Sequence, residues 1–358
     1  MKQHIKVTKV QESKVGTVDF DNIPFGRVFS DHMFIADYEN GAWKNFEIIP
    51  FSNFSMHPAS MALHYGQAIF EGMKASKSHT GQPLLFRPEM HPRRLNKSAE
   101  RMMMPAFPED VFLDALHLLV DLDAAWIPPQ EGSALYIRPY MFATDEFIGV
   151  KPSETYKFVI FTGPVGPYYS KPVNLKIEQK YVRAVPGGTG EAKAAGNYAG
   201  SLLPAKLAQE QGFDQVVWMG GKDKKDIHEV GTMNIFFVID GKVITPATDG
   251  AILHGITRDS FLKILEEKGI PAEERVITID EVYEAYQAGK LEEIFGAGTA
   301  AVVSHVASLT YGDHKMVLPP VEDRKIGPML KTYIDGLRSG KIEDTHGWII
   351  PVHQEVMA

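Results

Sequence analysis

Residues 191–198 read EAKAAGNY, and they directly follow the glycine-rich run PGGTG at 186–190. Lys193 stands among alanines and glycines, whose small side chains leave room beside it for a flat ligand. A lysine with few polar neighbours is poorly solvated, and a poorly solvated amine is a good nucleophile. A solvated lysine in a surface loop has the same local sequence. The octapeptide thus leaves two interpretations open, a reactive amine and an ordinary surface charge.

The length and charge of the chain indicate a two-domain protein that acts on small molecules. Its 358 residues exceed what one ordinary core holds, and two α/β domains are the expected arrangement. The net charge of -8 arises from 37 basic and 45 acidic residues that are interspersed along the whole length. Neither a nucleic-acid surface nor a polybasic membrane patch is indicated, so small molecules are the expected partners.

The absence of cysteine narrows the chemistry further. Disulfides, thiolate metal sites and cysteine nucleophiles are excluded. We expect no metal ion in the functional site. The composition fits a reducing compartment. The N-terminus MKQHIKVTKVQESK has no apolar segment and no arginine, and later apolar runs are too short to span a membrane. We therefore expect no membrane association and a cytoplasmic location. A precursor whose targeting segment had been removed would read the same way.

Turn-forming residues are densest at 162–172, TGPVGPYYSKP, and mark the expected division between domains. We predict an N-terminal domain at 1–164, a linker at 165–175, and a larger C-terminal domain at 176–358 that carries Lys193. No internal repeat interrupts this division.

Hydrophobic periodicity predicts strands and helices in both domains. In the N-terminal part the predicted strands are 33–36, 46–49, 134–138 and 157–161, and the predicted helices are 89–104 and 110–126. The first two strands form a hairpin through the turn at 39–41. Segments 63–66 and 68–72 mix aromatic residues with glycine, and we expect them to be loops that line a cleft.

The C-terminal part contains the clearest hairpin signal of the chain. The dipeptide Asp240-Gly241 stands between two apolar runs and favours a type I′ turn. Strands are predicted at 175–182, 215–219, 233–239, 242–245 and 295–300, and helices at 199–211, 258–268, 280–287 and 328–338. Thr278 and Glu281 are spaced as a capping box for the third of these helices.

The glycine cluster around Lys193 raises two chemistries. The run GGTGEAKAAG matches neither G-x-x-x-x-G-K-[ST] nor a clean G-x-G-x-x-G after a strand, so a nucleotide-binding domain stays open only as an alternative of a different class. A Schiff-base site for pyridoxal phosphate asks for a lysine, an acid at the ring nitrogen, phosphate donors and a clamp for the substrate carboxylate. The chain offers a candidate for each.

Candidates for the acid and for the phosphate donors lie in separate parts of the chain. Glu229 could keep the pyridine nitrogen protonated. GIT at 255–257 leads into a predicted helix, whose N-H groups and dipole favour a phosphate. GTA at 298–300 offers backbone donors, and Arg94 offers a bidentate charge. The ordinary interpretations are a strand-edge glutamate, a helix N-cap at Thr257, a common small-residue turn and a solvated helix arginine.

Seven segments, taken together, identify the family that the chain resembles. They are PFGRVFSDHMF, LHYGQAIFEGMKA, LFRPEMHPRRLN, LYIRPYMFA, EAKAAGNYAGSLL, HEVGTMNIFFV and GAGTAAVV, in this order over nearly the whole chain. The chain resembles the branched-chain amino acid aminotransferases, which are pyridoxal phosphate enzymes of fold type IV. The resemblance implies an α/β fold of the α+β type in two domains with the cofactor in the cleft between them, and a homodimer with the active site near the subunit interface.

The resemblance also implies roles for individual residues. Lys193 would be the catalytic lysine that binds the cofactor, with Tyr198 on the ring hydroxyl and Glu229 at the pyridine nitrogen. The other implied cofactor contacts are Arg94, Thr232, Ile256, Thr257 and Thr299. The implied substrate contacts are Phe25, Tyr65, Phe70, Tyr136, Arg138, Ile148, Val150, Tyr168, Thr299 and Ala300.

The implied substrate pocket has an apolar and a charged part. Aromatic walls suit leucine, isoleucine and valine, with Ile148 and Val150 reaching in from a second subunit, while Thr299 and Ala300 hold the α-carboxylate. Glutamate brings a second carboxylate that is costly to bury without a partner, and Arg138 is the expected partner. Its ordinary interpretation is a strand arginine paired with a nearby acid.

The implied activity is transamination between branched-chain L-amino acids and 2-oxoglutarate, which gives branched-chain 2-oxo acids and glutamate. D-amino acid aminotransferase and aminodeoxychorismate lyase are the alternatives within the fold. The chain departs from family members that carry C-x-x-C after the Gly-Thr-Ala turn, because Ala301 and Ser304 stand at those positions. Thiol-based regulation is therefore not implied for this chain.

Overall fold

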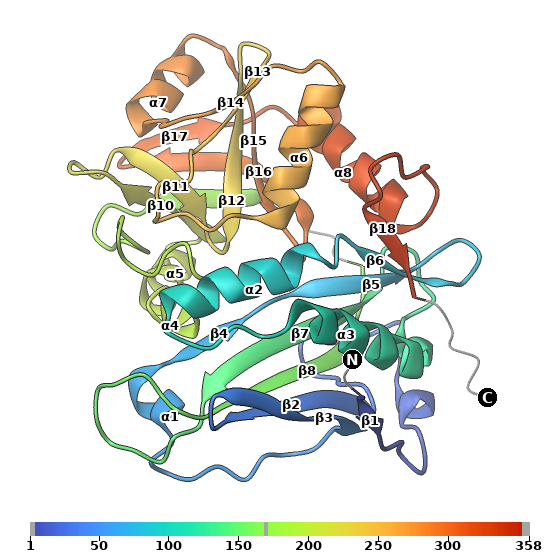
Figure 1. Cartoon of the computed structure of the whole chain (residues 1–358). Helices are drawn as coiled ribbons and strands as arrows, with labels where there is room; N and C mark the ends of the chain where they lie inside the picture. Colours follow the sequence, from blue (N-terminus) through green and yellow to red (C-terminus); the bar gives the residue numbers. More distant parts are fainter. Residues whose placement is uncertain (1–3, 168–170, 353–358) are drawn as a thin grey trace. The chain divides into compact units, whose positions relative to one another are not determined.

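The computed structural model of the chain describes residues 4–167 and 171–352. The described residues form two units, each with its own sheet (Figure 1). The first unit comprises 4–167, 192–195 and 335–352, and the second comprises 171–191 and 196–334. The mixed α/β class predicted from the sequence is confirmed.

The units differ from the predicted domains in where residues 192–195 and 335–352 belong. Lys193 was predicted in the C-terminal domain, whereas in the structure it is part of the first unit. Ala194 forms an antiparallel bridge with Ile69, and the main-chain N-H of Phe70 donates to the Lys193 carbonyl at 3.0 Å. Hydrogen bonds to a strand from the N-terminal half therefore decide the unit to which this lysine belongs.

The first unit is built on a nine-stranded sheet. In sheet order its strands are β1 (Lys6–Val7), β3 (Ala42–Pro50), β2 (His32–Glu39), β8 (Tyr156–Val165), β7 (Ala134–Ala143), β5 (Met73–Lys77), β6 (Pro83–Phe86) and β18 (Ile349–Pro351), while β4 (Ala68–Phe70) pairs with β7. The predicted hairpin near the N-terminus is confirmed as β2 and β3, which turn at Asn40 and Gly41 with φ values of 54° and 79°. Because β18 pairs with β6, the C-terminal part of the described chain belongs to this unit.

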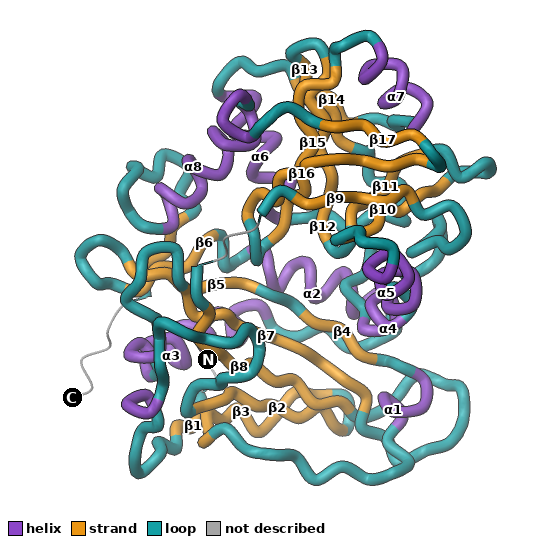
Figure 2. The backbone as a smooth tube through the Cα atoms, turned by 180° about the vertical axis from the view of Figure 1, so that it is seen from behind, coloured by secondary structure: helices purple, strands orange, loops and turns teal. Residues whose placement is uncertain are grey.

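Strand alternation gives this sheet two different faces. The helices of the first unit are α1 (Met61–Tyr65), α2 (Met90–Arg101) and α3 (Glu109–Leu122), followed by a 3-10 turn at Ala124–Trp126. Helices α2 and α3 cover the same face of the sheet (Figure 2), and their apolar side chains pack there with Phe34 and Phe158. The neighbouring strand residues Met33 and Val159 belong to a smaller cluster on the opposite face. Each large apolar side chain buried in this way contributes about 1.5–3 kcal/mol.

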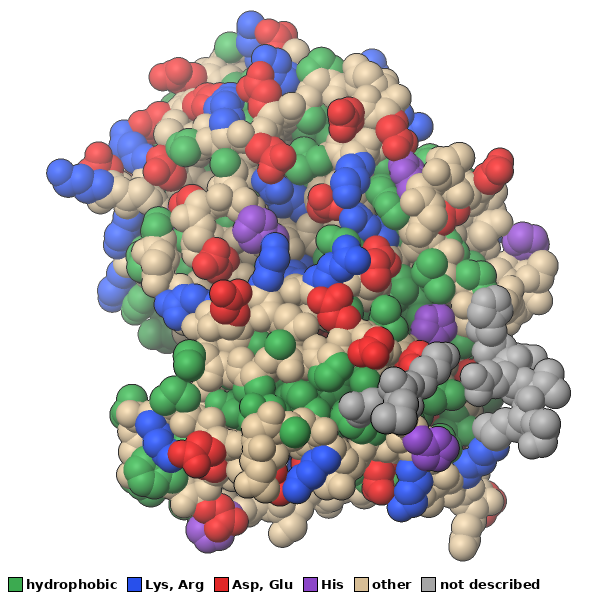
Figure 3. Space-filling view, viewed as in Figure 1, with side chains coloured by type: hydrophobic (Ala, Val, Ile, Leu, Met, Phe, Trp, Pro, Cys, Tyr) green, Lys and Arg blue, Asp and Glu red, His purple; other side chains and the backbone are tan. Residues whose placement is uncertain are grey.

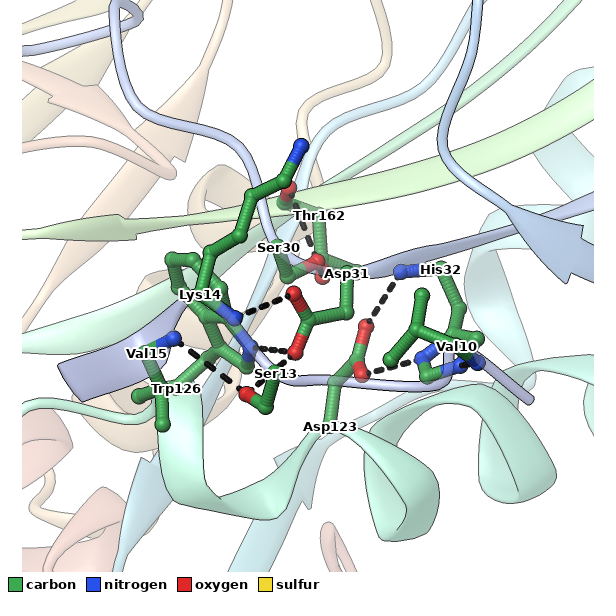
Figure 4. Close-up of polar contacts among 10 residues, drawn as sticks. All are labelled: Val10, Ser13, Lys14, Val15, Ser30, Asp31, His32, Asp123, Trp126 and Thr162. Carbon is green, nitrogen blue, oxygen red and sulfur yellow. Dashed lines mark hydrogen bonds and ion pairs between the residues drawn. The ribbon is translucent and has the colours of Figure 1, made fainter. Parts of the chain in front are cut away.

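Buried polar contacts fasten the N-terminal segment to the first unit (Figure 4). The Trp126 indole N-H donates to Asp31 at 2.8 Å, and His32 Nδ1 lies 2.7 Å from Asp123 Oδ1. The Val10 N-H donates to His32 Nε2 at 3.0 Å. A backbone N-H can only donate, so Nε2 is the acceptor and Nδ1 carries the ring proton towards Asp123. The chain ahead of β2 is thereby tied to the end of α3.

The second unit is built on another nine-stranded sheet. In sheet order its strands are β11 (Asp226–Val230), β10 (Gln215–Gly220), β9 (Val173–Ile177), β16 (Val302–Tyr311), β15 (Leu291–Gly298), β12 (Met233–Ile239), β13 (Lys242–Thr245) and β14 (Ala272–Glu274), while β17 (His314–Val317) pairs with β16. Strand β11 also pairs with β12. The predicted type I′ hairpin is confirmed, because β12 and β13 are joined through Asp240 and Gly241 with φ values of 52° and 72°.

Helices pack on both faces of the second sheet. They are α5 (Leu202–Glu210), α6 (Ile256–Glu267) and α7 (Ile279–Gln287), while α4 (Ala195–Ala199) and α8 (Ile326–Arg338) each cross a boundary between the units, and a 3-10 turn spans Val321–Asp323. Phe236 and Phe295 stack with ring centroids 5.3 Å apart, and Phe261 of α6 meets Phe236 edge-on. The next strand residue, Phe237, packs in the cluster that contains Val282 of α7.

Two helices of the second unit have side-chain caps. The Glu281 N-H donates to the Thr278 hydroxyl at 3.2 Å, which is one half of the capping box predicted for α7. The buried Glu293 carboxylate accepts the N-H groups of Ile326 and Gly327 at the start of α8, at 2.7 and 2.8 Å. A carboxylate at this position is stabilised by the helix dipole.

Several predicted segments have different bounds in the structure. Segments 63–66 and 68–72 are not simply loops, because they contribute to α1 and β4, and β4 pairs with β7. The helix predicted at 110–126 ends at Leu122, where Asp123 bonds with His32. The strand predicted at 175–182 ends at Ile177 because the Glu178 carboxylate accepts the N-H groups of the next turn.

The surface carries charges of both signs. On the face shown in Figure 3, Lys and Arg side chains are interspersed with Asp and Glu side chains. No helix within 4–167 and 171–352 is long and apolar enough to cross a membrane. The same described residues contain no group of three or more His, Asp or Glu side chains arranged to hold a metal ion.

Candidate active site

Lys193 is fixed by its main chain on both sides. Its N-H donates to the Ser98 hydroxyl of α2 at 2.9 Å, and its carbonyl accepts the Phe70 N-H at 3.0 Å. Ala192 and Ala194 are buried on either side of it, so small side chains allow this close packing. The ammonium nitrogen lies 4.9 Å from the centre of the Phe70 ring. Lys193 is therefore a half-buried amine held over an aromatic face, and not a solvated loop lysine.

Arg94 shares a buried cluster with Glu71 and His91. Glu71 follows β4, is 0% exposed, and accepts hydrogen bonds from Arg94 Nε and Nη2, both at 2.7 Å. His91 Nδ1 lies 2.7 Å from Glu71 Oε2. Burial raises the pKa of the Glu71 carboxyl, but the charge and hydrogen bonds of Arg94 outweigh burial and hold this pKa well below its usual range. Arg94 is thus an anchored, buried cation, and its interpretation as a solvated helix arginine is wrong.

Four predicted substrate residues form a continuous cluster in the first unit. The rings of Phe25 and Tyr136 meet edge-on with centroids 5.8 Å apart. Arg138 Nη2 donates to the Tyr136 hydroxyl at 2.9 Å, and its guanidinium lies 4.8 Å from the centre of the Phe70 ring. A Cβ at Gly72 would lie 2.4 Å from the Tyr136 hydroxyl oxygen, so glycine makes room for this ring.

Among the described residues of the first unit, no acid balances the charge of Arg138. Within the described ranges no carboxylate lies within ion-pair distance of Arg138, and its buried Nε has no hydrogen-bond partner. The interpretation as a strand arginine paired with a nearby acid is therefore wrong. A partly buried guanidinium without a counter-ion is costly, and an anionic ligand would lower that cost.

Glu229 is a buried and well-fixed carboxylate of the second unit. Arg183 Nε lies 2.8 Å from Glu229 Oε2. The Leu253 N-H and the Asn234 side-chain amide donate to Glu229 Oε1 at 2.9 and 3.3 Å. Because β11 pairs with β10 on one side and β12 on the other, Glu229 lies inside the sheet, and its interpretation as a strand-edge residue is wrong.

Helix α6 begins earlier than predicted, at Ile256, with Gly255 as its N-cap. Thr257 lies in the first turn, so its interpretation as the N-cap is wrong. Glycine supplies no capping side chain, and a Cβ at Gly255 would lie 2.0 Å from the Asn234 amide oxygen. The N-terminus of α6 is thereby packed against the residue that bonds Glu229, and it is the end of the helix that attracts anions.

Strand register gathers the second-unit candidates at one end of their sheet. Glu229 pairs with Asn234, and Asn234 pairs with Ala297, across β11, β12 and β15. Thr232 lies in the turn that joins β11 to β12 at this end. The turn that contains Thr299 and joins β15 to β16 lies at the same end.

Close packing also shapes the turn at Thr299 and Ala300. The preceding Gly298 faces Met233, because a Cβ at Gly298 would lie 3.1 Å from the Met233 side chain. Glycine therefore lets β15 pass close to β12 immediately before the turn. Both turn residues are partly buried.

The remaining predicted residues lie in other parts of the chain. Tyr198 lies in α4, and Tyr65 is the last residue of α1. Ile148 and Val150 are 64% and 92% exposed in the segment between β7 and β8. Tyr168 lies outside the described residues.

Five residues that contact the candidate site were missed by sequence reasoning. They are Glu71, His91, Ser98, Arg183 and Asn234. Only Glu71 had a usable signal, because it is the single charged residue in the run AIFEGM at 68–73. The others depend on contacts between residues distant in sequence.

Each unit carries groups that pyridoxal phosphate requires. The first unit provides a half-buried primary amine at Lys193 and a buried cation at Arg94. The second unit provides the buried Glu229 carboxylate and the N-terminus of α6. The chemistry of these donors fits an aromatic aldehyde that carries a phosphate and a basic ring nitrogen.

Comparisons with known proteins give consistent results. Residues 68–309 match the family model for amino-transferase class IV. The chain is 47% identical to branched-chain-amino-acid aminotransferase 2 of Bacillus subtilis, over 98% of this chain and 98% of that protein. It is 45% identical to a probable branched-chain-amino-acid aminotransferase of Staphylococcus epidermidis, over 98% of this chain and 99% of that protein.

Solved structures with the same fold include two aminotransferases. The branched-chain amino acid aminotransferase from Escherichia coli has a TM-score of 0.73 and 29% identity, covering 90% of this chain and 99% of that chain. The branched-chain aminotransferase from the thermophilic archaeon Thermoproteus uzoniensis, solved with norvaline, has a TM-score of 0.75 and 24% identity, covering 90% of this chain and 100% of that chain. At that identity the second structure supports the fold alone.

Proposed function

Because the chain belongs to the class IV aminotransferases and, within them, to the branched-chain-amino-acid aminotransferases, we propose that it exchanges an amino group between leucine, isoleucine or valine and 2-oxoglutarate. The products are the branched-chain 2-oxo acids and glutamate. The observation that carries the proposal is the placement of Lys193. Its main-chain N-H and carbonyl are both hydrogen-bonded, and its amine is held over the Phe70 ring. The family inferred from seven sequence segments is confirmed by the family model and by the relatives.

Pyridoxal 5'-phosphate is the cofactor of this activity. When bound, it supplies an electrophilic carbon for the amino group and a ring that accepts electrons from the substrate α-carbon. In our proposal Lys193 holds the cofactor covalently, Tyr198 contacts its ring hydroxyl and Glu229 its ring nitrogen. The residues proposed to hold its phosphate are Arg94, Thr232, Ile256, Thr257 and Thr299.

Lys193 also moves the substrate proton. Lys193 Nζ would remove the proton from the substrate α-carbon as a general base, and the resulting ammonium would deliver that proton to the cofactor carbon as a general acid. The Phe70 ring beside Nζ shields that side of the amine from water. Arg183 and the Leu253 N-H stabilise the negative charge of Glu229, which can then hold a proton on the ring nitrogen.

The substrate binds through an apolar surface and two anion contacts. Thr299 and Ala300 hold the α-carboxylate, and Arg138 holds the second carboxylate of glutamate or 2-oxoglutarate. The missing acidic partner of Arg138 supports this role. The apolar contacts in the proposal are Phe25, Tyr65, Phe70, Tyr136 and Tyr168, with Ile148 and Val150 of a second subunit.

Two further features belong to the proposal. A homodimer with the active site near its interface gives the exposed Ile148 and Val150 side chains an apolar partner. A cytoplasmic location is consistent with a chain that has no cysteine.

A coupled assay tests the proposed activity. The purified protein is expected to be yellow and to form glutamate from L-leucine and 2-oxoglutarate, whereas D-alanine and aminodeoxychorismate give no more than background. Lys193→Ala is expected to lose the visible absorption and the activity. A colourless wild-type protein, or one that prefers D-alanine or aminodeoxychorismate, would refute the assignment.

A further inference from the structure

Two buried residues outside the proposed catalytic and binding set contact it directly. Glu71 is 0% exposed and Ser98 is 1% exposed, and both lie in the first unit. Glu71 bonds the Arg94 guanidinium, and Ser98 bonds the main chain of Lys193. Each contact fixes one of the two residues that must engage the same cofactor.

Helix α2 connects these contacts. Ser98 lies one turn after Arg94, and its hydroxyl donates to the Arg94 carbonyl at 3.1 Å. The same oxygen accepts the Lys193 N-H at 2.9 Å. One hydroxyl therefore ties the backbone of Lys193 to the helical turn that carries Arg94.

Strand β4 provides a second connection. Phe70 donates its N-H to the Lys193 carbonyl, and the next residue, Glu71, bonds Arg94. The Glu71 N-H donates in turn to the Pro139 carbonyl at 2.7 Å, which holds this end of β4 beside β7. Lys193 and Arg94 are thus linked through Phe70, the last residue of β4, and the adjacent Glu71, as well as through one helix.

The bidentate contact fixes more than the charge of Arg94. A carboxylate that accepts both Nε-H and Nη2-H sets the plane of the guanidinium as well as its position. His91 adds a third hydrogen bond to the same carboxylate at 2.7 Å and restrains Glu71 from the preceding turn of α2. A buried arginine without this acid would be costly and free to change rotamer.

We propose that Glu71 and Ser98 are positioning residues that hold the Arg94 guanidinium and the Lys193 main chain in one fixed relation, so that both engage the cofactor at once. This inference rests on the proposed function, in which Arg94 binds the phosphate and Lys193 the reactive carbon. Glu71 acts through Arg94, and Ser98 acts through Lys193. The fixed relation lowers the entropy cost of ordering the Arg94 side chain and the Lys193 main chain when the cofactor binds.

Titration of cofactor-free protein with pyridoxal phosphate tests the inference without measuring turnover. In Glu71→Gln the side-chain NH2 group replaces one carboxylate oxygen. This NH2 group then faces an N-H donor of either Arg94 or His91 and cannot accept its hydrogen bond. The cofactor dissociation constant, read from the visible absorption, is expected to rise about tenfold or more. In Ser98→Ala the Lys193 N-H loses its acceptor, and the constant is expected to rise about threefold to tenfold.

A double-mutant cycle separates positioning from general damage to the fold. If Glu71 acts through Arg94, then Glu71→Gln combined with Arg94→Lys should bind the cofactor within about twofold of Arg94→Lys alone. Glu293→Gln is the matched control, because Glu293 is a buried carboxylate that accepts several backbone N-H groups far along the chain at α8. It is expected to lower the unfolding temperature while leaving the dissociation constant within about twofold of wild type.

The outcomes distinguish this inference from the proposed function. If wild type forms no Lys193-dependent absorption with pyridoxal phosphate, the proposed function fails and the inference falls with it. If Glu71→Gln and Ser98→Ala bind pyridoxal phosphate as tightly as wild type does, only the inference is overturned. The same holds if Glu71→Gln raises the dissociation constant by the same factor in the Arg94→Lys background as in wild type. If Glu71→Gln does not fold, the dissociation constant of Ser98→Ala is compared with that of Glu293→Gln. A rise in Ser98→Ala alone supports the inference, and equal constants overturn it.

Discussion

Arg183 Nε lies 2.8 Å from Glu229 Oε2, and the two side chains are only 10% and 5% exposed. The same guanidinium donates from Nη2 to the carbonyls of Gly190 and Ala251. One arginine therefore neutralises the buried acid and ties it to two loops of the second unit. This arrangement explains how a carboxylate can stay charged inside a sheet.

Replacing Arg183 is expected to damage both stability and catalysis. Arg183→Gln leaves the Glu229 charge buried without its partner, which should lower the free energy of unfolding by about 3–5 kcal/mol. Turnover of leucine should fall by about tenfold or more, because Glu229 would lose the ion pair that holds its carboxylate in place. Urea unfolding and a leucine assay measure the two effects. Arg275→Gln, at a surface arginine that is paired with Glu281 in the same unit, should leave turnover unchanged.

Replacing Arg138 is expected to separate the two substrates. Arg138→Met removes the proposed partner of the second carboxylate but keeps an apolar stem over Phe70. The kcat/KM for 2-oxoglutarate should fall by about 30-fold or more, while that for leucine in its half-reaction should stay within about threefold. Equal losses for both substrates would show that Arg138 serves the structure and not the recognition of a second carboxylate.

A methyl group at Gly72 is expected to displace Tyr136. The added Cβ would lie 2.4 Å from the Tyr136 hydroxyl, which also accepts a hydrogen bond from Arg138. Gly72→Ala should cost about 1–3 kcal/mol of stability and raise the KM for 2-oxoglutarate. Gly16→Ala is the control, because nothing lies within 4 Å of a Cβ at that position. Unchanged kinetics in Gly72→Ala would mean that Tyr136 does not need its observed place.

His305 is expected to make the protein less stable in mild acid. Burial, together with the nearby charges of Arg324 and Lys331, lowers the pKa of His305 from 6.5 to about 4. Between these values the unfolded chain binds a proton that the folded chain does not. The contribution of His305 to the free energy of unfolding is therefore complete above about pH 6.5 and is lost as the pH falls towards about 4.

Urea unfolding of two histidine variants checks this pH dependence. After allowance for solvent screening, wild type should lose about 1 kcal/mol more than His305→Gln between about pH 7 and pH 5. His314→Gln, on the exposed strand β17, should behave as wild type does. If the free energy of unfolding falls equally with pH in wild type and in His305→Gln, the role given to His305 is contradicted.

Local patterns were enough to predict much of the fold. The hairpin at Asp240 and Gly241 depends on a two-residue turn whose φ values few other residues adopt, so the dipeptide alone identifies it. Helix α2 follows from apolar spacing within one segment. By contrast, α6 starts at Ile256 because Gly255 packs against Asn234, a contact across distant segments that no local pattern contains.

The candidate site was only partly predictable for the same reason. Lys193 could be found from its small neighbours, and the family resemblance gave it a role. Its membership in the first unit depends on hydrogen bonds to Phe70 and Ser98, which are far away in sequence. Arg183 becomes recognisable only when the fold brings it beside Glu229 in a buried place.

Identification of the modified lysine tests the central claim most directly. The purified protein is reduced with borohydride, which makes the bond between lysine and cofactor permanent, and its peptides are then mapped by mass spectrometry. The phosphopyridoxyl group should be found on the peptide that contains Lys193, and it should be absent from Lys193→Ala treated in the same way. A phosphopyridoxyl group on another lysine, or on none, would contradict the account.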